Sequence, residues 1–302
     1  MVIPPVTALR FLILIALISL AGPVSRAQDY PLPGRRVDIG GYKLYIHCLG
    51  EGHPTVVLDH GLGGSSGDWK QVQVGVSRFT RVCRYDRGGY GQSDWGPAPR
   101  TSSRLAAELR TLLARAEISP PYILAGHSFG GYNMRLFASF YPHDVAGLML
   151  VDSPNEDQIT GFFQSRIVRQ IDPTGTLAQL WRPDMLSALS SLDPIAALLG
   201  FKFPTLRTIL DELAGFKESG EELRTAVAYF DIPLVVIHHD RPLLPAGPFD
   251  IPIDQEWEAL QRKLASRYKR HTFIVAKGSN HNITREQPAL IIEAIRRLFK
   301  SL

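Results

Sequence analysis

The chain has 302 residues, of which 45% are hydrophobic and 21% are charged, and its formal net charge is +4. This is the composition of an ordinary globular protein, long enough for one large α/β domain or two small ones. The near balance of charge, without a basic run that contains interleaved aromatic residues, argues against a nucleic-acid-binding surface.

The first 27 residues have the pattern of an export signal. Arg10 precedes an apolar run from Phe11 to Ala21 in which Ser19 is the one polar residue, and Ser25-Arg26-Ala27 offers small residues where a signal peptidase reads them. The run is short for a bilayer span. We therefore expect a cleaved signal peptide over residues 1–27 and an exported (periplasmic or extracellular) protein without stable membrane insertion. Its net charge falls to +2, because the signal holds two arginines and no acid. An uncleaved N-terminal tether is the alternative.

Strands and helices alternate through the next part of the chain. The predicted strands, in order, cover residues 36–39, 42–46, 55–58, 80–85, 122–125 and 145–151. Helices are expected at residues 69–76, 104–116 and 132–141. This alternation predicts the α/β class, with a doubly wound, mostly parallel sheet that carries helices on both faces.

The alternation breaks after residue 154. Helical fragments without any strand signal extend from residue 155 to residue 230, far beyond an ordinary connection. Strands return at residues 232–240 and 272–275, and helices at 253–268 and 288–299. We predict a core made of residues 28–154 and 231–302, with a helical cap inserted at 155–230.

The two cysteines, Cys48 and Cys83, each lie in a strand-like segment. Export would permit a disulfide between them, but a small buried hydrophobic residue is the default at such positions, and we favour free thiols. No C-x-x-C pattern or cluster of His and Cys indicates a metal, so we expect no metal site.

A Gly-x-Ser-x-Gly turn joins a strand to a helix at Ser128. Gly126 and Gly130 flank it closely enough for the strand and the helix to pass each other. The serine hydroxyl would project beyond the sheet edge, and the helix N-terminus would direct N–H groups at whatever it attacks. This context favours a nucleophile over a glycine-rich turn that happens to hold a serine.

Four motifs in this order resemble the α/β-hydrolase family over nearly all of residues 34–302. They are His60-Gly61 after a strand, Asp86-Arg87-Gly88 through Ser93 after the next, the Ser128 turn, and Gly278-x-x-His281 before the last helix. The resemblance implies that His281 is the base that activates Ser128. It also implies that Asp86 and Arg87 hold loops beside the site.

Two aspartates compete for the role of the acid that orients His281. Asp152 ends the strand after the nucleophile helix, a position that some family members use. Asp240 ends the following strand, the commoner position, but Arg241-Pro242 stands where a longer turn with the acid is usual. We favour Asp152 and keep Asp240 as the alternative.

The backbone N–H groups of Phe129 and Leu62 are the expected oxyanion-hole donors. The resemblance therefore implies a cofactor-free serine hydrolase that cleaves a small-molecule carboxylic ester, or an amide, through an acyl-enzyme. An acyltransferase, a peptidase or a cofactor-free haloperoxidase would use the same triad, and a slow-turnover ligand-binding protein could share the fold. Aspartate replaces the serine in haloalkane dehalogenases and epoxide hydrolases of this fold, which argues against both.

Overall fold

The computed structural model describes residues 33–158, 203–226, 231–242 and 253–302. The predicted signal peptide and most of the predicted cap therefore lie outside the described residues. Within those ranges, no helix has both the length and the apolar character that crossing a membrane would require.

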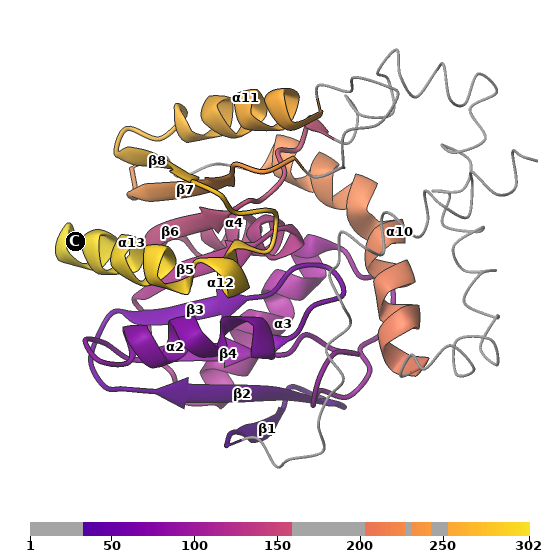
Figure 1. Cartoon of the computed structure of the whole chain (residues 1–302). Helices are drawn as coiled ribbons and strands as arrows, with labels where there is room; N and C mark the ends of the chain where they lie inside the picture. The colour runs from indigo at the N-terminus through magenta and orange to yellow at the C-terminus, as the bar shows by residue number, and fades with distance from the viewer. Residues whose placement is uncertain (1–32, 159–202, 227–230, 243–252) are drawn as a thin grey trace, which may run out of the picture.

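The described strands form one twisted, eight-stranded sheet in the order β1-β2-β4-β3-β5-β6-β7-β8 (Figure 1). The sheet is antiparallel at β1 and β2 and parallel from β4 to β8. Its strands are β1 (Arg35–Asp38), β2 (Lys43–Leu49), β3 (Thr55–Asp59), β4 (Val82–Tyr85), β5 (Tyr122–His127), β6 (Val145–Val151), β7 (Leu234–His239) and β8 (His271–Ala276). The predicted α/β sheet is confirmed.

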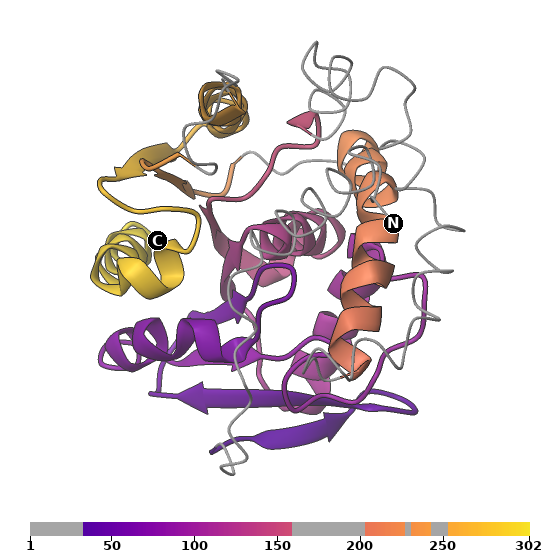
Figure 2. The same cartoon turned by 45° about the vertical axis from the view of Figure 1, so that its right-hand side comes forward.

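Helices cover both faces of this sheet (Figure 2). One face carries α2 (Lys70–Val76), α12 (Ile283–Glu286) and α13 (Pro288–Lys300). The other carries α3 (Ser102–Arg115), α4 (Phe129–Phe140) and α11 (Ile253–Ala265). Two short 3-10 helices, η1 (Ser66–Trp69) and η2 (Pro142–Asp144), precede α2 and β6.

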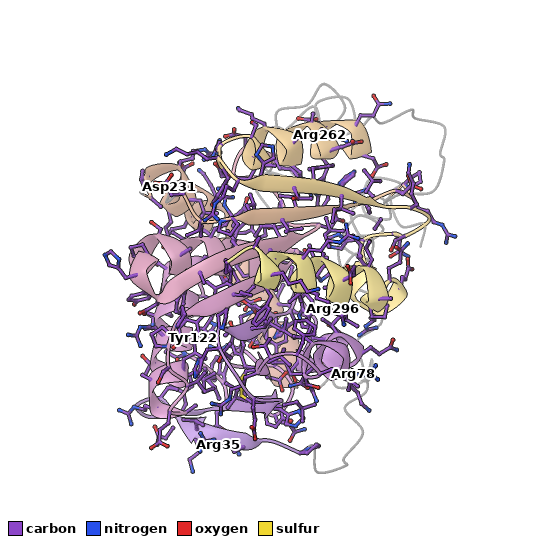
Figure 3. The ribbon with its side chains drawn as sticks, turned by 90° about the vertical axis from the view of Figure 1, so that its left-hand side faces the viewer. Arg35, Arg78, Tyr122, Asp231, Arg262 and Arg296 are labelled. Carbon is purple, nitrogen blue, oxygen red and sulfur yellow. A yellow bond between two sulfur atoms is a disulfide. The ribbon has the colours of Figure 1, made fainter. Side chains whose placement is uncertain are left out.

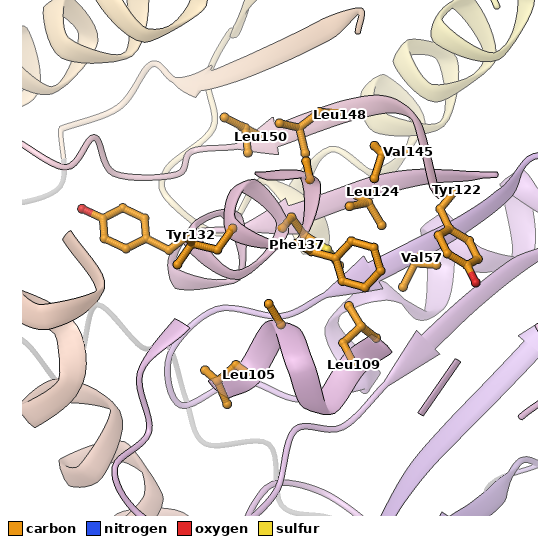
Figure 4. Packing of buried hydrophobic residues seen from close by; sticks show 14 of the residues in the cluster. Val57, Leu105, Leu109, Tyr122, Leu124, Tyr132, Phe137, Val145, Leu148 and Leu150 are labelled. Atoms are coloured by element: carbon orange, nitrogen blue, oxygen red, sulfur yellow. The ribbon is translucent and has the colours of Figure 1, made fainter. Parts of the chain in front are cut away.

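The central strands are apolar throughout because both of their faces are covered. Alternate side chains point to opposite sides: Leu124 and Leu148 face α3 and α4, whereas Ile123 and Met149 face α2 and α13. Figure 4 shows the first of these two layers, with Phe137 of α4 packed between the sheet and α3. Two closed apolar layers hold the carboxyl ends of the parallel strands in fixed register.

One helix of the predicted cap is described, α10 (Phe203–Thr225). It runs across the carboxyl edge of the sheet in both views (Figures 1 and 2). Phe216 stacks on Phe129, with ring centroids 5.1 Å apart, and Leu213 packs into a small cluster with Tyr90. This helix therefore covers the end of the sheet where the Ser128 turn lies.

The expectation of two free thiols is wrong, because Cys48 and Cys83 form a disulfide (Figure 3). The pairing of β2 with β4 explains it: the two residues are direct partners in the antiparallel register. Directly opposed residues in such a ladder have their Cβ atoms within disulfide range. The sequence identified two strands, but only their pairing showed that the cysteines face each other.

We expect the C48A/C83A double variant to lose about 4 kcal/mol of unfolding free energy, because the bridge closes a loop across 35 positions of the chain. Urea denaturation of the oxidised protein and the variant measures this difference. Adding a phosphine reductant should destabilise the wild type and leave the variant unchanged. Equal stability of all samples would show that the bridge does not constrain the unfolded chain.

Candidate active site

Ser128 occupies a strained turn between β5 and α4. Its φ of 50° and ψ of −124° lie where L-residues are rarely found, and its N–H donates to the Val151 carbonyl at 3.0 Å. A Cβ on Gly126 would lie 2.4 Å from the Gly130 carbonyl oxygen, so the close passage of strand and helix needs glycine there. The predicted strand–turn–helix is present, with Ser128 at its apex.

Asp152 and His281 meet beside this turn. Asp152 follows β6 with a φ of 48° and is fully buried, and its Oδ2 lies 2.6 Å from His281 Nδ1. His281 belongs to the loop between β8 and α12, and His127 Nε2 donates to its carbonyl oxygen at 2.8 Å. That bond ties the His281 loop to the residue directly before Ser128.

Asp240 lies elsewhere. It is exposed, accepts a hydrogen bond from the Gly278 N–H at 2.9 Å, and pairs with Lys277 at 3.2 Å. Both contacts stabilise its ionised form and lower its pKa. Of the two aspartates that the sequence left in competition, the structure brings Asp152 to His281 and turns Asp240 towards solvent.

Asp152 has partners that the sequence reasoning missed. Its Oδ2 also accepts from His239 Nδ1 at 2.7 Å, and its Oδ1 accepts from Gln261 Nε2 at 3.1 Å. His238 Nδ1 lies 3.3 Å from Oδ1, outside hydrogen-bond geometry. The sequence did contain a signal for these contacts: His238 and His239 are adjacent at the carboxyl end of a parallel strand. Ligand and catalytic sites of such sheets lie at that edge.

Burial alone would raise the pKa of Asp152, but the contacts from His238, His239 and His281 outweigh it and hold that pKa well below its ordinary value. Asp152 is therefore an anion. His127 is neutral, because burial and the neighbouring His281 lower its pKa to about 4. Of these two buried groups, Asp152 is therefore charged and His127 is not.

The His60-Gly61 loop lies against the Ser128 turn. A Cβ on Gly61 would stand 3.2 Å from Ser128 Cβ, so a larger residue would crowd the serine. Among the described residues, the N–H groups of Leu62 and Phe129 have no hydrogen-bond partner. The Phe129 N–H has none within its helix because it opens α4.

The buried side chain of Arg87 holds the His60-Gly61 loop through hydrogen bonds to its backbone. Its guanidinium donates to the carbonyl oxygens of His60 and Gly61 at 2.5 and 3.1 Å. The same group pairs with Asp59 at 2.6 Å and, in a two-pronged contact, with Glu212 of α10 at 2.8 and 2.9 Å. The loop-holding role predicted for Arg87 fits these contacts, and α10 supplies the partner that the sequence did not show.

Within the described ranges, Asp152, His238 and His239 form a group of three potential metal ligands, with ligand atoms within 4.8 Å of one another. A cation bound there would need the Asp152 carboxylate, which already accepts from His239 and His281. Metal binding at this group would therefore compete with the contact between Asp152 and His281.

The comparisons with known proteins agree with this geometry. The family model for the α/β-hydrolase fold matches residues 54–176. The protein YqjL of Bacillus subtilis (strain 168) is 27% identical over 250 residues, which cover 82% of this chain and 85% of YqjL. Together with the sheet order and the nucleophile turn, the match shows that the chain has the α/β-hydrolase fold.

Two solved structures illustrate the fold. An esterase from Thermogutta terrifontis superposes with a TM-score of 0.59 at 21% identity, covering 89% of this chain and 98% of the esterase. A proposed epoxide hydrolase from Pseudomonas aeruginosa superposes with a TM-score of 0.66 at 16% identity, covering 91% and 98% of the two chains. At these identities the likeness concerns the fold and leaves the reaction to the site itself.

Proposed function

We propose that the protein is a serine hydrolase that cleaves a carboxylic ester of a small molecule through an acyl-enzyme. The observation that carries the proposal is the 2.6 Å contact between Asp152 and His281 beside the strained Ser128 turn. The buried Asp152 carboxylate accepts the hydrogen bond from His281 Nδ1. It therefore keeps the His281 imidazole in the tautomer whose Nε2 can accept the serine proton. The serine at this position also argues against epoxide hydrolase chemistry, which uses an aspartate there.

In this mechanism Ser128 Oγ attacks the ester carbonyl while His281 Nε2 takes its proton. The N–H groups of Leu62 and Phe129 hold the oxyanion, and Asp152 stabilises the imidazolium that forms. His281 then returns the proton to the departing alcohol. Water, activated by the same histidine, attacks the acyl-enzyme, releases the acid and restores Ser128. These steps require neither cofactor nor metal.

We expect a fluorophosphonate probe to label Ser128 and p-nitrophenyl acetate to be hydrolysed. Mass spectrometry of the labelled peptide identifies the residue, and Ser128→Ala should abolish both reactions. Ser139→Ala, at another serine of α4, is the matched control. A folded protein that neither reacts with the probe nor turns over esters of increasing acyl length would be a binding protein, and the proposal would fail.

The rival enzyme activities are outcomes of the same experiment. Labelled protein that transfers its acyl group to an added alcohol faster than to water would be an acyltransferase. Faster cleavage of peptides than of esters would indicate a peptidase. Faster halogenation with peroxide and bromide than ester hydrolysis would indicate a cofactor-free haloperoxidase. Each would retain Ser128, His281 and Asp152 and change only the acyl donor or the acceptor of the acyl group.

We also propose that the protein is exported, as its N-terminal sequence predicts. The Cys48–Cys83 disulfide supports this, because such bonds persist in oxidising compartments. Expression of the full chain in a bacterium, followed by N-terminal sequencing of the periplasmic product, tests it. Cleavage after Ala27 is expected, and an intact N-terminus in the membrane fraction would favour the tether.

A further inference from the structure

The direction of the Leu62 N–H is set by contacts on the other end of its peptide group. The Gly61 carbonyl oxygen accepts from Arg87 at 3.1 Å and from the Gly64 N–H at 3.2 Å. This oxygen and the N–H of Leu62 belong to one trans peptide group, in which they point in opposite directions. Contacts that hold the Gly61 oxygen therefore also aim the Leu62 N–H.

The next peptide group, between Leu62 and Gly63, is held by Tyr90. The Tyr90 hydroxyl accepts from the Gly63 N–H at 3.3 Å and donates to Glu212 Oε2 at 2.8 Å. Burial and the Glu212 carboxylate raise the pKa of Tyr90 well above its ordinary value, so the hydroxyl keeps the proton that it donates. Tyr90 thus connects the residue after Leu62 to helix α10.

The ring of Tyr90 packs against the same loop. It lies edge-on to the His60 ring, with centroids 4.9 Å apart, and Leu62 packs against the small apolar cluster that Tyr90 forms with Leu213 and its neighbours on α10. Tyr90 is only 1% exposed. A side chain enclosed in this way has little room to move, so it can fix the backbone that it contacts.

The contacts on both sides of Leu62 converge on one carboxylate. Glu212 Oε2 accepts from Arg87 at 2.9 Å as well as from Tyr90, and Glu212 is fully buried. Arg87 leads from this carboxylate to the Gly61 carbonyl, and Tyr90 leads from it to the Gly63 N–H. Helix α10 therefore holds two consecutive peptide groups of the loop through a single side chain.

We propose that Tyr90 is a positioning residue of the oxyanion hole, whose hydroxyl transmits the position of α10 to the Leu62 backbone through Gly63. The inference rests on the proposed function, because it concerns a donor of that reaction. An oxyanion-hole donor stabilises the transition state only at hydrogen-bond distance from the oxygen on which charge develops. Docking of α10 through Glu212 is thus part of building the hole.

The consequence for the reaction falls on two steps equally. Formation and hydrolysis of the acyl-enzyme each pass through a tetrahedral oxyanion, and the same hole serves both. A displaced Leu62 N–H therefore slows acylation and deacylation by the same factor and leaves KM nearly unchanged.

Tyr90→Phe tests the proposal, because it removes the hydroxyl and keeps the ring. We expect stopped-flow kinetics with p-nitrophenyl acetate to show acylation and deacylation slowed about tenfold, less than the loss of a whole donor would cost. The affinity for an aliphatic trifluoromethyl ketone should fall by the same factor, because Ser128 Oγ adds to its carbonyl and leaves an oxyanion in the same hole. Thermal melts verify that the variant is folded.

Tyr122→Phe is the matched control. Tyr122 is fully buried, its hydroxyl donates to the Ile118 carbonyl at 2.6 Å, and it begins β5, at the end of the strand away from Ser128. We expect both variants to lose stability and Tyr90→Phe alone to lose rate and ketone affinity. Unchanged rate constants and ketone affinity in folded Tyr90→Phe would overturn the proposal, and so would equal losses in the two variants.

Hydrogen exchange gives a reading that does not depend on activity. We expect the backbone amides of residues 60–66, followed by mass spectrometry of the peptides that contain them, to exchange faster in Tyr90→Phe than in the wild type or in Tyr122→Phe. Unchanged exchange in this segment would also overturn the proposal. If Ser128 proves unreactive, the proposed function fails, and the exchange result still decides whether Tyr90 holds the loop.

Discussion

We expect Asp152→Asn to lower kcat/KM for p-nitrophenyl acetate by about 10³- to 10⁴-fold. Asparagine has nearly the shape of aspartate but carries no charge. It can neither hold His281 in the required tautomer nor stabilise the imidazolium that forms when Ser128 is deprotonated. Initial rates for wild type and variant measure the effect, and thermal melts of both verify that the variant is folded.

Asp240→Asn is the matched control, since it makes the same chemical change at the other candidate acid. Asp240 contributes an exposed ion pair with Lys277 and a bond to the Gly278 backbone, so we expect activity to change by less than about twofold. Loss of activity in Asp240→Asn with activity retained in Asp152→Asn would assign the acid to the later strand and contradict the mechanism.

The second large effect is expected at Glu212. Glu212→Ala should lower the free energy of unfolding by about 3–5 kcal/mol, because it removes one of two carboxylates from a fully buried guanidinium. Burial opposes the charge of Arg87, and the carboxylates of Glu212 and Asp59 reverse that effect and raise its pKa well above the ordinary value. Tyr90 would also lose the acceptor of its hydroxyl proton. Urea denaturation measures the loss.

Glu212→Ala should lower kcat as well, since Arg87 also holds the carbonyl groups of the His60-Gly61 loop. Glu221→Ala, on the same helix, is the control: its side chain is 56% exposed and pairs with Arg224, so its effect should stay below about 1 kcal/mol. Equal effects of the two variants would show that the buried contact does not hold α10 against the core.

The contrast between Asp152 and Asp240 shows why the acid was ambiguous. Both residues end parallel strands at the same edge of the sheet, and sequence spacing cannot tell where either side chain points. The structure separates them through the backbone: a φ of 48° turns Asp152 inward to His281, whereas the backbone of Asp240 bonds to Ser279 and its carboxylate faces Lys277. Only long-range packing sets these directions.

The disulfide and His239 were misjudged or missed for a related reason. Cys48 and Cys83 meet because β2 runs antiparallel beside β4, and nothing local specifies which strands become neighbours. His239 was read as part of a strand, while its partner Asp254 belongs to a helix that follows residues outside the described structure. Sequence position says little about contacts between segments that only the sheet order brings together.

The sequence by itself determined the class of the fold, the strand–turn–helix at Ser128 and the loop position of His281, because these depend on local periodicity and on glycines that only a tight turn requires. The tertiary structure decided which carboxylate reaches His281, that the two cysteines are bonded, and that Arg87 and His239 have acidic partners on α10 and α11. The physical reason is that a buried charge needs a counter-charge wherever the fold can bring one, and that choice depends on packing across the whole chain.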